Sequence, residues 1–131
     1  MIYGVGTDLI EIKRVERVLA RFGERFAQRI LCEPELKRFR AHKQPVAYLA
    51  KRFAAKEAFT KALGTGIRSP ANWHGVWVVN LKSGRPVLEF SPDLKILLKT
   101  KKISGAHLSL TDEREMASAT VILECADQAE A

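Results

Sequence analysis

The sequence predicts an α+β domain, with most of its helices in the first half of the chain and most of its strands in the second. Apolar residues recur every three to four positions over 12–26, which is the spacing of an amphipathic helix, and the segment 46–63 is rich in Ala and Lys between Pro45 and Gly64, which is typical of a long helix. Apolar and polar residues alternate over 106–111 and 116–124, which is the spacing of strands. Together these patterns favour antiparallel strands combined with one long helix.

The first half opens with a short apolar segment, residues 2–6, which is typical of a buried strand and ends in Thr7-Asp8. The pattern after it predicts a helix over 12–26. The apolar face of that helix is formed by Ile12, Val15, Leu19, Phe22 and Phe26.

Two more helices are expected before the middle of the chain. A short one is predicted near Pro34, with Leu36 and Phe39 pointing inward. The longest predicted helix covers 46–63, because Pro45 precedes it and Gly64 is a typical helix-ending residue.

The second half is expected to form a hairpin, a helix and a pair of strands. The hairpin strands are 76–81 and 87–90, and a Ser-Gly-Arg-Pro turn joins them. A helix is predicted over 92–102. The alternating segments 106–111 and 116–124 complete the chain as two antiparallel strands around an acidic turn.

Composition and charge restrict the classes of function. The 131 residues suit one domain, 1–131, and 22 Lys and Arg against 15 Asp and Glu give a net charge of +7. That charge favours nucleic acid, a membrane surface, a polyphosphate ligand or an acidic protein as partner. No run suits a membrane helix and no signal peptide is visible, while Cys32 and Cys125 suit free thiols in a reducing compartment. We therefore expect a cytoplasmic protein.

Two acidic residues and a lysine are candidates for a site that holds a metal-bound phosphate. Asp8 follows the first predicted strand, where a side chain reaches into a cleft or simply caps a turn. Glu57 and Lys61 share one face of the long predicted helix, as an ordinary solvated pair also would. Gly64 and Gly66 offer exposed backbone amides. Since Mg²⁺ typically binds one or two carboxylates together with phosphate oxygens and water, we expect Asp8 and Glu57 to share one Mg²⁺.

Two other surfaces are less specific. His107, Ser109 and Thr111 lie on one face of a predicted strand, which is either a solvated surface or a row that faces a ligand or a neighbouring subunit. The predicted helix over 12–26 has a basic face, which is either solvated or binds an acidic partner. That face consists of Lys13, Arg14, Arg17 and Arg21.

These residues closely resemble the signature motifs of the bacterial holo-acyl-carrier-protein synthases, which are 4′-phosphopantetheinyl transferases. The two signatures are GVGTD at 4–8 and RFAAKEAFTKALGTG at 52–66. The match continues through GRP at 84–86 and HLSLT at 107–111, so it covers nearly the whole chain in order. The resemblance implies the 4′-phosphopantetheinyl transferase fold, an antiparallel sheet with a long central helix.

The resemblance also implies a reaction. A serine hydroxyl of an apo acyl carrier protein would attack the β-phosphate of coenzyme A, so that phosphopantetheine is transferred and 3′,5′-ADP leaves. Asp8 and Glu57 would hold Mg²⁺, and Lys61 would contact the phosphate chain and assist catalysis. Glu57, directly or through a metal-bound water, is the candidate to accept the serine proton.

The remaining contacts implied by the resemblance concern coenzyme A and the partner proteins. Arg52 and His107 would hold the nucleotide end of coenzyme A, with Ser109 beside them and Pro86 near the adenine. The glycine turn at 64–66 would contact the cofactor as well. The family forms homotrimers whose active sites fall at subunit interfaces. The basic helix would dock the acidic carrier protein, mainly through Arg14, Arg17 and Arg21.

Two alternatives remain on chemical grounds alone. A Mg²⁺-dependent nuclease would also use two carboxylates and a lysine around a phosphate. A basic nucleic-acid-binding module without activity would account for the charge. It is disfavoured because no aromatic residues alternate with the basic residues of the 12–26 helix between positions 13 and 21.

Overall fold

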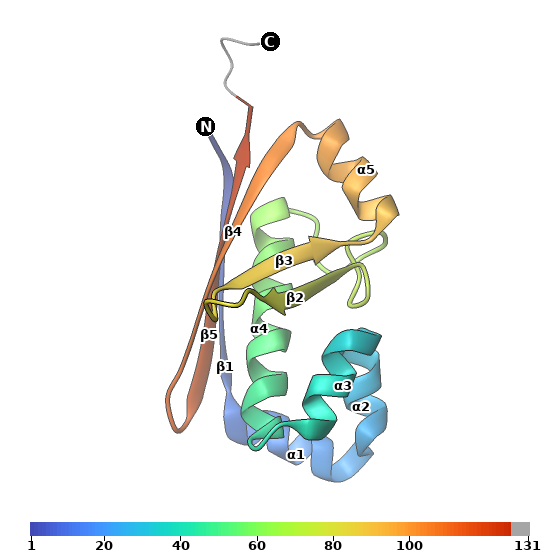
Figure 1. Ribbon diagram of the computed structural model, residues 1–131, viewed down its shortest axis with the longest axis vertical. Coiled ribbons are helices and arrows are strands. Elements are labelled where there is room, and N and C mark those ends of the chain that lie inside the picture. Colours follow the sequence, from blue (N-terminus) through green and yellow to red (C-terminus); the bar gives the residue numbers. More distant parts are fainter. Residues whose placement is uncertain (127–131) are drawn as a thin grey trace.

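The computed structural model describes residues 1–126, with a sheet along one side and the helices against it (Figure 1). In chain order the elements are β1 (Ile2–Glu11), α1 (Ile12–Phe22), α2 (Glu24–Ile30), α3 (Glu33–Ala41), α4 (Pro45–Leu63), β2 (Val76–Asn80), β3 (Pro86–Phe90), α5 (Pro92–Thr100), β4 (Ile103–Asp112) and β5 (Met116–Cys125). This order confirms the predicted α+β class.

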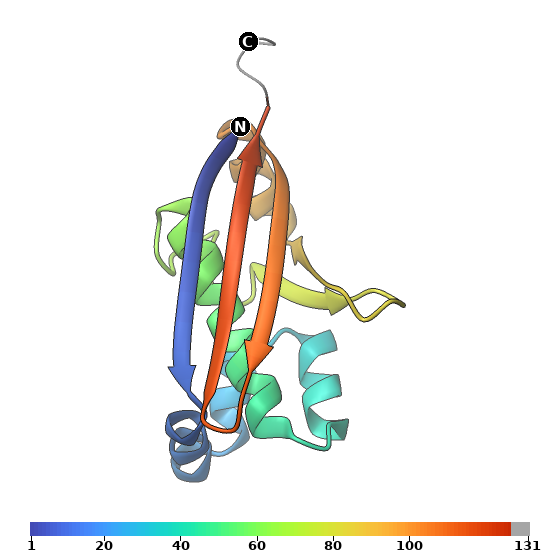
Figure 2. The ribbon, with the colours of Figure 1, turned by 90° about the vertical axis from the view of Figure 1, so that its left-hand side faces the viewer.

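The main sheet is antiparallel and has the order β1-β5-β4, so that β1 and β4 are its edges. β2 and β3 form a separate antiparallel hairpin, which lies on the β4 side of the sheet (Figure 2). α4 packs along one face of the sheet, mainly against β1 and β5. Figure 2 looks onto the opposite face, which no helix covers.

Glycines on β1 set the distance between the sheet and α4. A Cβ atom at Gly4 would lie 2.1 Å from the carbonyl oxygen of Ala62, and one at Gly6 would lie 1.9 Å from that of Ala58. Both distances are far below van der Waals contact, so only glycine allows the backbone of β1 to approach α4 this closely. Small residues on both elements therefore bring the strand and the helix together.

The other face of β1 points away from the helices. Side chains alternate across a strand, so Val5 and Leu9 point to the uncovered face, where they are 55% and 65% exposed. The prediction of a buried strand is therefore confirmed only for the side of β1 that faces α4 and is wrong for the other side. Apolar side chains occupy both faces of β1, but α4 covers only one of them.

Most predicted element positions are confirmed, but the bounds of several elements differ from the prediction. α4 begins one residue before the predicted start and ends at the predicted Leu63, with Gly64 in the left-handed conformation at φ 88°. The predicted helix over 12–26 is interrupted at Gly23, which has φ 65° and separates α1 from α2. β1 extends to Glu11, because its pairing with β5 continues to Met116.

No helix within residues 1–126 has both the length and the apolar character that a membrane crossing requires.

Candidate active site

Asp8 lies inside β1 and not at its carboxyl end, which corrects the sequence-based placement. It pairs with Ala119 of the central strand β5, and it shares the α4-facing side of β1 with Gly4 and Gly6. Its side chain is only 15% exposed. The carboxylate is therefore held at the margin between β1 and α4.

Lys61 of α4 meets Asp8 at this margin. Its ammonium Nζ donates to Asp8 Oδ1 at 3.2 Å and to the carbonyl oxygen of Thr7 at 3.0 Å. Glu57 lies one turn earlier on α4, on the same flank. The structure thus brings Asp8, Glu57 and Lys61 together, although 49 residues or more separate Asp8 from the other two.

The two carboxylates lie close enough to influence each other. Burial raises the pKa of Glu57, the negative charge of Asp8 raises it further, and the Lys61 ammonium opposes both effects. A site in which like charges face each other across a gap favours a cation between them. The charge pattern is therefore what a cation-binding site requires.

The donor set fits Mg²⁺ when a phosphate ligand completes it. Within residues 1–126 there is no group of three or more His, Cys, Asp or Glu side chains that could hold a metal ion. Mg²⁺ does not need such a group, because it typically binds one or two carboxylates and takes its other ligands from substrate phosphates and water. Asp8 and Glu57 would supply the protein ligands.

The glycine turn after α4 lies just beyond Lys61. Gly64 and Gly66 have φ values of 88° and 68°, and nothing lies within 4 Å of a Cβ placed at either position. These glycines are required by the left-handed backbone and not by a close neighbour. The turn is open on its outer side, as a ligand-binding turn needs to be.

Arg52 occupies the opposite side of α4. It is nine positions from Lys61, which at 3.6 residues per turn is about half a rotation away. Only 4% of Arg52 is exposed. Its guanidinium lies 4.1 Å from the centre of the Tyr48 ring and donates through Nη2 to Asn80 Oδ1 at 2.8 Å. Burial lowers the pKa of Arg52.

A basic cavity of about 340 Å³ opens at Arg52. Arg52 Nε and the hydroxyl of Tyr48 lie buried beside this cavity without a hydrogen-bond partner. Asn80 pairs with Pro86 at the end of the β2–β3 hairpin and donates to the carbonyl oxygen of Gly84 at 3.1 Å. Arg52 and Pro86 are thereby brought to one place. The cavity is lined by Arg38, His42, Tyr48, Lys51, Arg52, Asn80, Leu81 and Gly84.

Sequence reasoning missed Tyr48, Asn80, Arg38 and His42 as members of this cavity. Tyr48 carried a usable signal, since it lies one turn before Arg52 on the same helix face. The other three come from α3, the residue after it and β2, and their proximity to Arg52 depends on the tertiary fold.

His107 and Ser109 lie on β4, on the uncovered face of the sheet. They pair with Ile122 and Thr120 of β5, whose neighbours Val121 and Ala119 point instead toward α4. The imidazole of His107 contacts the carboxylate of Glu124. Within residues 1–126 no hydrogen bond or ion pair links His107 or Ser109 to Asp8 or Arg52, so a single chain does not assemble all the predicted residues.

The basic face of α1 begins directly after β1, close to Asp8 in the chain. Arg14, Arg17 and Arg21 are exposed. Arg17 lies 3.6 Å from Glu11, and Arg21 lies 5.2 Å from the centre of the Phe22 ring. Exposed pairs of this kind contribute little to stability, so these side chains remain free for other contacts.

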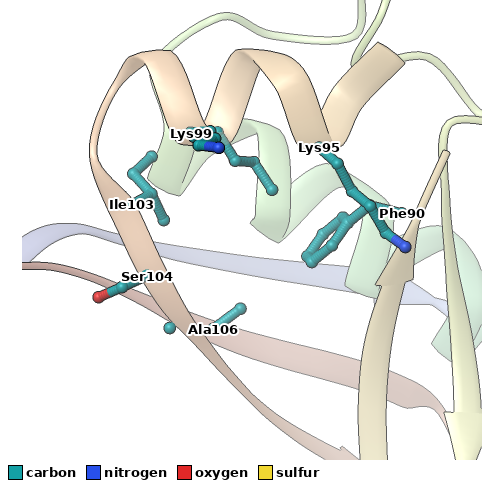
Figure 3. Close-up of a pocket in the computed structure, with 8 residues that line it drawn as sticks. Phe90, Lys95, Lys99, Ile103, Ser104 and Ala106 are labelled. Carbon is teal, nitrogen blue, oxygen red and sulfur yellow. The ribbon is translucent and has the colours of Figure 1, made fainter. Parts of the chain in front are cut away.

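A separate cavity of about 260 Å³ opens between α5 and the start of β4 (Figure 3). Phe90 and Ile103 contribute apolar surface, and Lys95 and Lys99 of α5 lie along its edge. None of the predicted site residues lines it.

Comparisons with known proteins agree with these features. Residues 4–120 match the family described as the 4′-phosphopantetheinyl transferase superfamily. A holo-[acyl-carrier-protein] synthase of Nitrosospira multiformis is 48% identical over 124 residues, which cover 95% of this chain and 99% of that protein. A holo-[acyl-carrier-protein] synthase of Vibrio cholerae is 52% identical over 124 residues, which cover 95% and 98%.

Solved structures give the same result. The holo-[acyl-carrier-protein] synthase of Neisseria meningitidis superposes with a TM-score of 0.92 at 44% identity, covering 95% of this chain and 99% of that one. The Bacillus anthracis enzyme, in complex with coenzyme A (3′,5′-ADP), superposes with a TM-score of 0.81 at 36% identity, covering 96% and 99%.

Proposed function

The chain belongs to the holo-[acyl-carrier-protein] synthases of the 4′-phosphopantetheinyl transferase superfamily, and on this premise we propose that Asp8, Glu57 and Lys61 form its active centre. It transfers 4′-phosphopantetheine from coenzyme A to acyl carrier protein. The observation that supports this centre is the meeting of two carboxylates and an ammonium at the margin of β1 and α4. The matched relatives give no support to a nuclease or a nucleic-acid-binding module.

Asp8 and Glu57 would hold Mg²⁺ together with the pyrophosphate of coenzyme A. Bound there, Mg²⁺ would supply positive charge to phosphate oxygens as negative charge develops on them. The raised pKa of Glu57 and its dependence on the charge of Asp8 support this role, because a cation would relieve the repulsion.

Lys61 and Glu57 have separate tasks in the transfer. Lys61 places its ammonium beside the phosphates and neutralises their charge. The serine oxygen of the carrier protein forms a bond to the β-phosphorus, and the bond from that phosphorus to the bridging oxygen breaks, which releases 3′,5′-ADP. Glu57, directly or through a metal-bound water, accepts the serine proton.

The nucleotide end of coenzyme A would bind the Arg52 cavity, with Pro86 beside the adenine and His107 and Ser109 on the adjacent strand. The basic lining of the cavity supports this assignment, since Arg38, Lys51 and Arg52 suit a phosphate. The β2–β3 hairpin, which supplies Asn80, Leu81 and Gly84 to the lining of the cavity, lies on the β4 side of the sheet, whereas Asp8 lies on its β1 edge (Figure 2).

The active centre at Asp8 and the row formed by His107 and Ser109 are best brought together by a second copy of the chain. The uncovered sheet face carries Val5 and Leu9 as exposed apolar side chains, in the same face as His107 and Ser109. Exposed apolar surface of this kind typically marks an interface. We infer a homotrimer in which the β1 edge of one copy meets the β4 edge of the next, each copy being a single transferase domain.

The basic face of α1 would dock the acidic carrier protein. Arg14, Arg17 and Arg21 are exposed and follow Asp8 directly in the chain, so that a protein bound to α1 has its serine within reach of the active centre. Charge complementarity of this kind mainly raises the association rate.

One experiment tests the active centre. The protein is incubated with coenzyme A, Mg²⁺ and apo acyl carrier protein, and mass spectrometry measures the phosphopantetheine added. We expect Asp8→Asn and Glu57→Gln each to lower the rate by about 100-fold or more, by analogy with the loss of other charge-stabilising groups. Glu113→Gln, which removes an exposed carboxylate in the β4–β5 turn, is the control. Retention of most activity by either site variant would show that the centre lies elsewhere.

A further inference from the structure

Lys56 and Glu35 form a buried ion pair on the side of α4 that faces away from the main sheet. Lys56 precedes Glu57 on α4 but points away from the sheet, and none of its surface is exposed. Its Nζ donates to Glu35 Oε1, to the carbonyl oxygen of Ile30 and to that of Trp73, each at 2.7 Å. These three bonds use all the donors of the ammonium group.

Glu35 is satisfied just as fully. It is 1% exposed, its Oε1 also accepts the backbone N–H of Cys32 at 3.0 Å, and its Oε2 accepts that of Val78 at 2.9 Å. The pair therefore ties α4 to the end of α2, to the start of α3, to the 73–75 segment and to β2. Phe53 stacks on Trp73 at 5.0 Å between ring centres and packs that segment against α4 as well.

Stability alone is a poor explanation for such a pair. Moving two charges out of water is costly, and well-packed apolar residues in place of a buried pair are often as stable. What a directional ion pair supplies beyond apolar packing is a defined position, because its hydrogen bonds are satisfied in only one arrangement.

That position matters because α4 is held from two sides. On the sheet side, Ala58 and Ala62 contact the glycines of β1, which sets the distance between helix and strand. Contact between small residues restricts rotation about the helix axis only weakly. Lys56, on the roughly opposite side of the helix, supplies a directional anchor against that rotation.

A small rotation would disturb the active centre. Side-chain ends lie about 5–6 Å from the axis of a helix, so a rotation of roughly 10° moves the Glu57 carboxylate about 1 Å relative to Asp8. A misplacement of about 1 Å can reduce a rate by roughly 100-fold.

We propose that Lys56 is a positioning residue for phosphopantetheine transfer: its pair with Glu35 fixes the rotation of α4 and so sets the separation of Glu57 from Asp8. This inference rests on the proposed roles of Asp8 and Glu57. It also gives a role to the 68–74 segment, for which the motifs provide none, since the carbonyl of Trp73 is one of the three anchors.

The test uses a double variant, because a single change would leave a buried charge unpaired. In Lys56→Met/Glu35→Gln no charge remains, and the amide oxygen of Gln still accepts the backbone N–H of Cys32, whereas the N–H of Val78 loses its acceptor. Leu94→Ala, which opens a cavity under α5 away from the site, is the control for general destabilisation. Activities are compared at a temperature well below both melting temperatures.

We expect kcat of the double variant to fall by about 10- to 100-fold and its Mg²⁺ affinity, measured by calorimetry with coenzyme A present, to fall by about tenfold. Leu94→Ala should stay near the wild type in both. If the double variant and Leu94→Ala had the same kcat and the same Mg²⁺ affinity, whether both near the wild type or both reduced, the inference would be overturned, because the pair would then act only on stability.

Glu35→Gln alone keeps three neutral oxygen acceptors around Lys56 but leaves its charge without a counter-ion. It is the second variant if the double variant does not fold, and it is assayed at a temperature where circular dichroism shows that it is folded. Its kcat should fall by about threefold to tenfold, and an unchanged kcat overturns the inference. Asp8→Asn separates this result from the proposed function. If Asp8→Asn is active, the active centre itself is misassigned. If Asp8→Asn is inactive and the double variant is fully active, only the positioning role of Lys56 is wrong.

Discussion

Gly6→Ala tests whether the close approach of β1 to α4 creates the active centre. The added methyl group would lie 1.9 Å from the carbonyl oxygen of Ala58 and 2.6 Å from the backbone nitrogen of Ala62. Real Cβ atoms essentially never come within 3.0 Å of such atoms, so the helix must withdraw by about 1 Å. Both neighbours are backbone atoms within α4, and therefore no side-chain rotation can relieve the contact.

The displacement acts directly on the site. Lys61 Nζ and Asp8 Oδ1 are 3.2 Å apart, and a further 1 Å takes the pair beyond hydrogen-bond distance. Overpacking of this kind typically destabilises a fold by about 1–3 kcal/mol. For a domain of this size that is a fall in Tm of very roughly 3–15 °C. We expect kcat/KM for coenzyme A to fall by about 100-fold at temperatures where the variant is folded.

Gly105→Ala is a matched control. A Cβ atom at Gly105 would meet its nearest neighbour, a carboxylate oxygen of Glu124, at 3.5 Å, which is ordinary contact. Thermal unfolding by circular dichroism and transfer measured by mass spectrometry are followed for both variants. If Gly6→Ala kept the Tm and the kcat/KM of Gly105→Ala, the glycine contact would not be what positions the site, and the reasoning would fail.

Three further predictions concern separate parts of the site. Arg14→Glu should raise KM for acyl carrier protein by about tenfold or more and reduce the salt dependence of that KM, while KM for coenzyme A is unchanged. Lys95→Glu on α5 is the charge-matched control, and equal effects of the two variants would exclude a docking role for α1. Arg52→Ala should raise KM for coenzyme A by about tenfold or more, since it removes a charged hydrogen-bond donor, and steady-state kinetics with an unchanged KM would contradict the assignment of the cavity. The folded-state pKa of Glu57 is raised, mainly by burial, so the native state holds this proton more strongly than the unfolded state does. Stability is therefore lost as the pH rises from the ordinary carboxyl pKa through the raised folded-state pKa. Glu57→Gln should therefore have a higher Tm than the metal-free wild type at neutral pH and an equal Tm below that window, and a lower Tm at neutral pH would refute this explanation.

The sequence was most informative where local chemistry decides the structure. Pro45 and Gly64 mark both ends of α4, so the helix and its Glu57–Lys61 face follow from local signals. The meeting of that face with Asp8 could be expected from the motifs. The interruption at Gly23 was missed, because the apolar spacing continues across it to Phe26 while the backbone takes φ 65°.

Tertiary contacts were not accessible in the same way. The position of Asp8 inside β1 depends on how far β5 extends beside it, which no local pattern states. Glu35 and Lys56 are 21 residues apart and look like two ordinary surface charges in the sequence. The separation of His107 from Asp8 depends on strand order, since each lies on a different face and a different edge of the sheet.

The two flanks of α4 have a consequence for how the protein behaves in a cell. If each active site takes Asp8 from one copy and the Arg52 cavity from another, no single chain contains a complete active site. Each chain then contributes to two different active sites. A chain defective only at Asp8 and a chain defective only at Arg52, when made together, would rebuild some intact sites between them. Loss-of-function alleles at these two positions would then complement each other, whereas two alleles on the same flank would not.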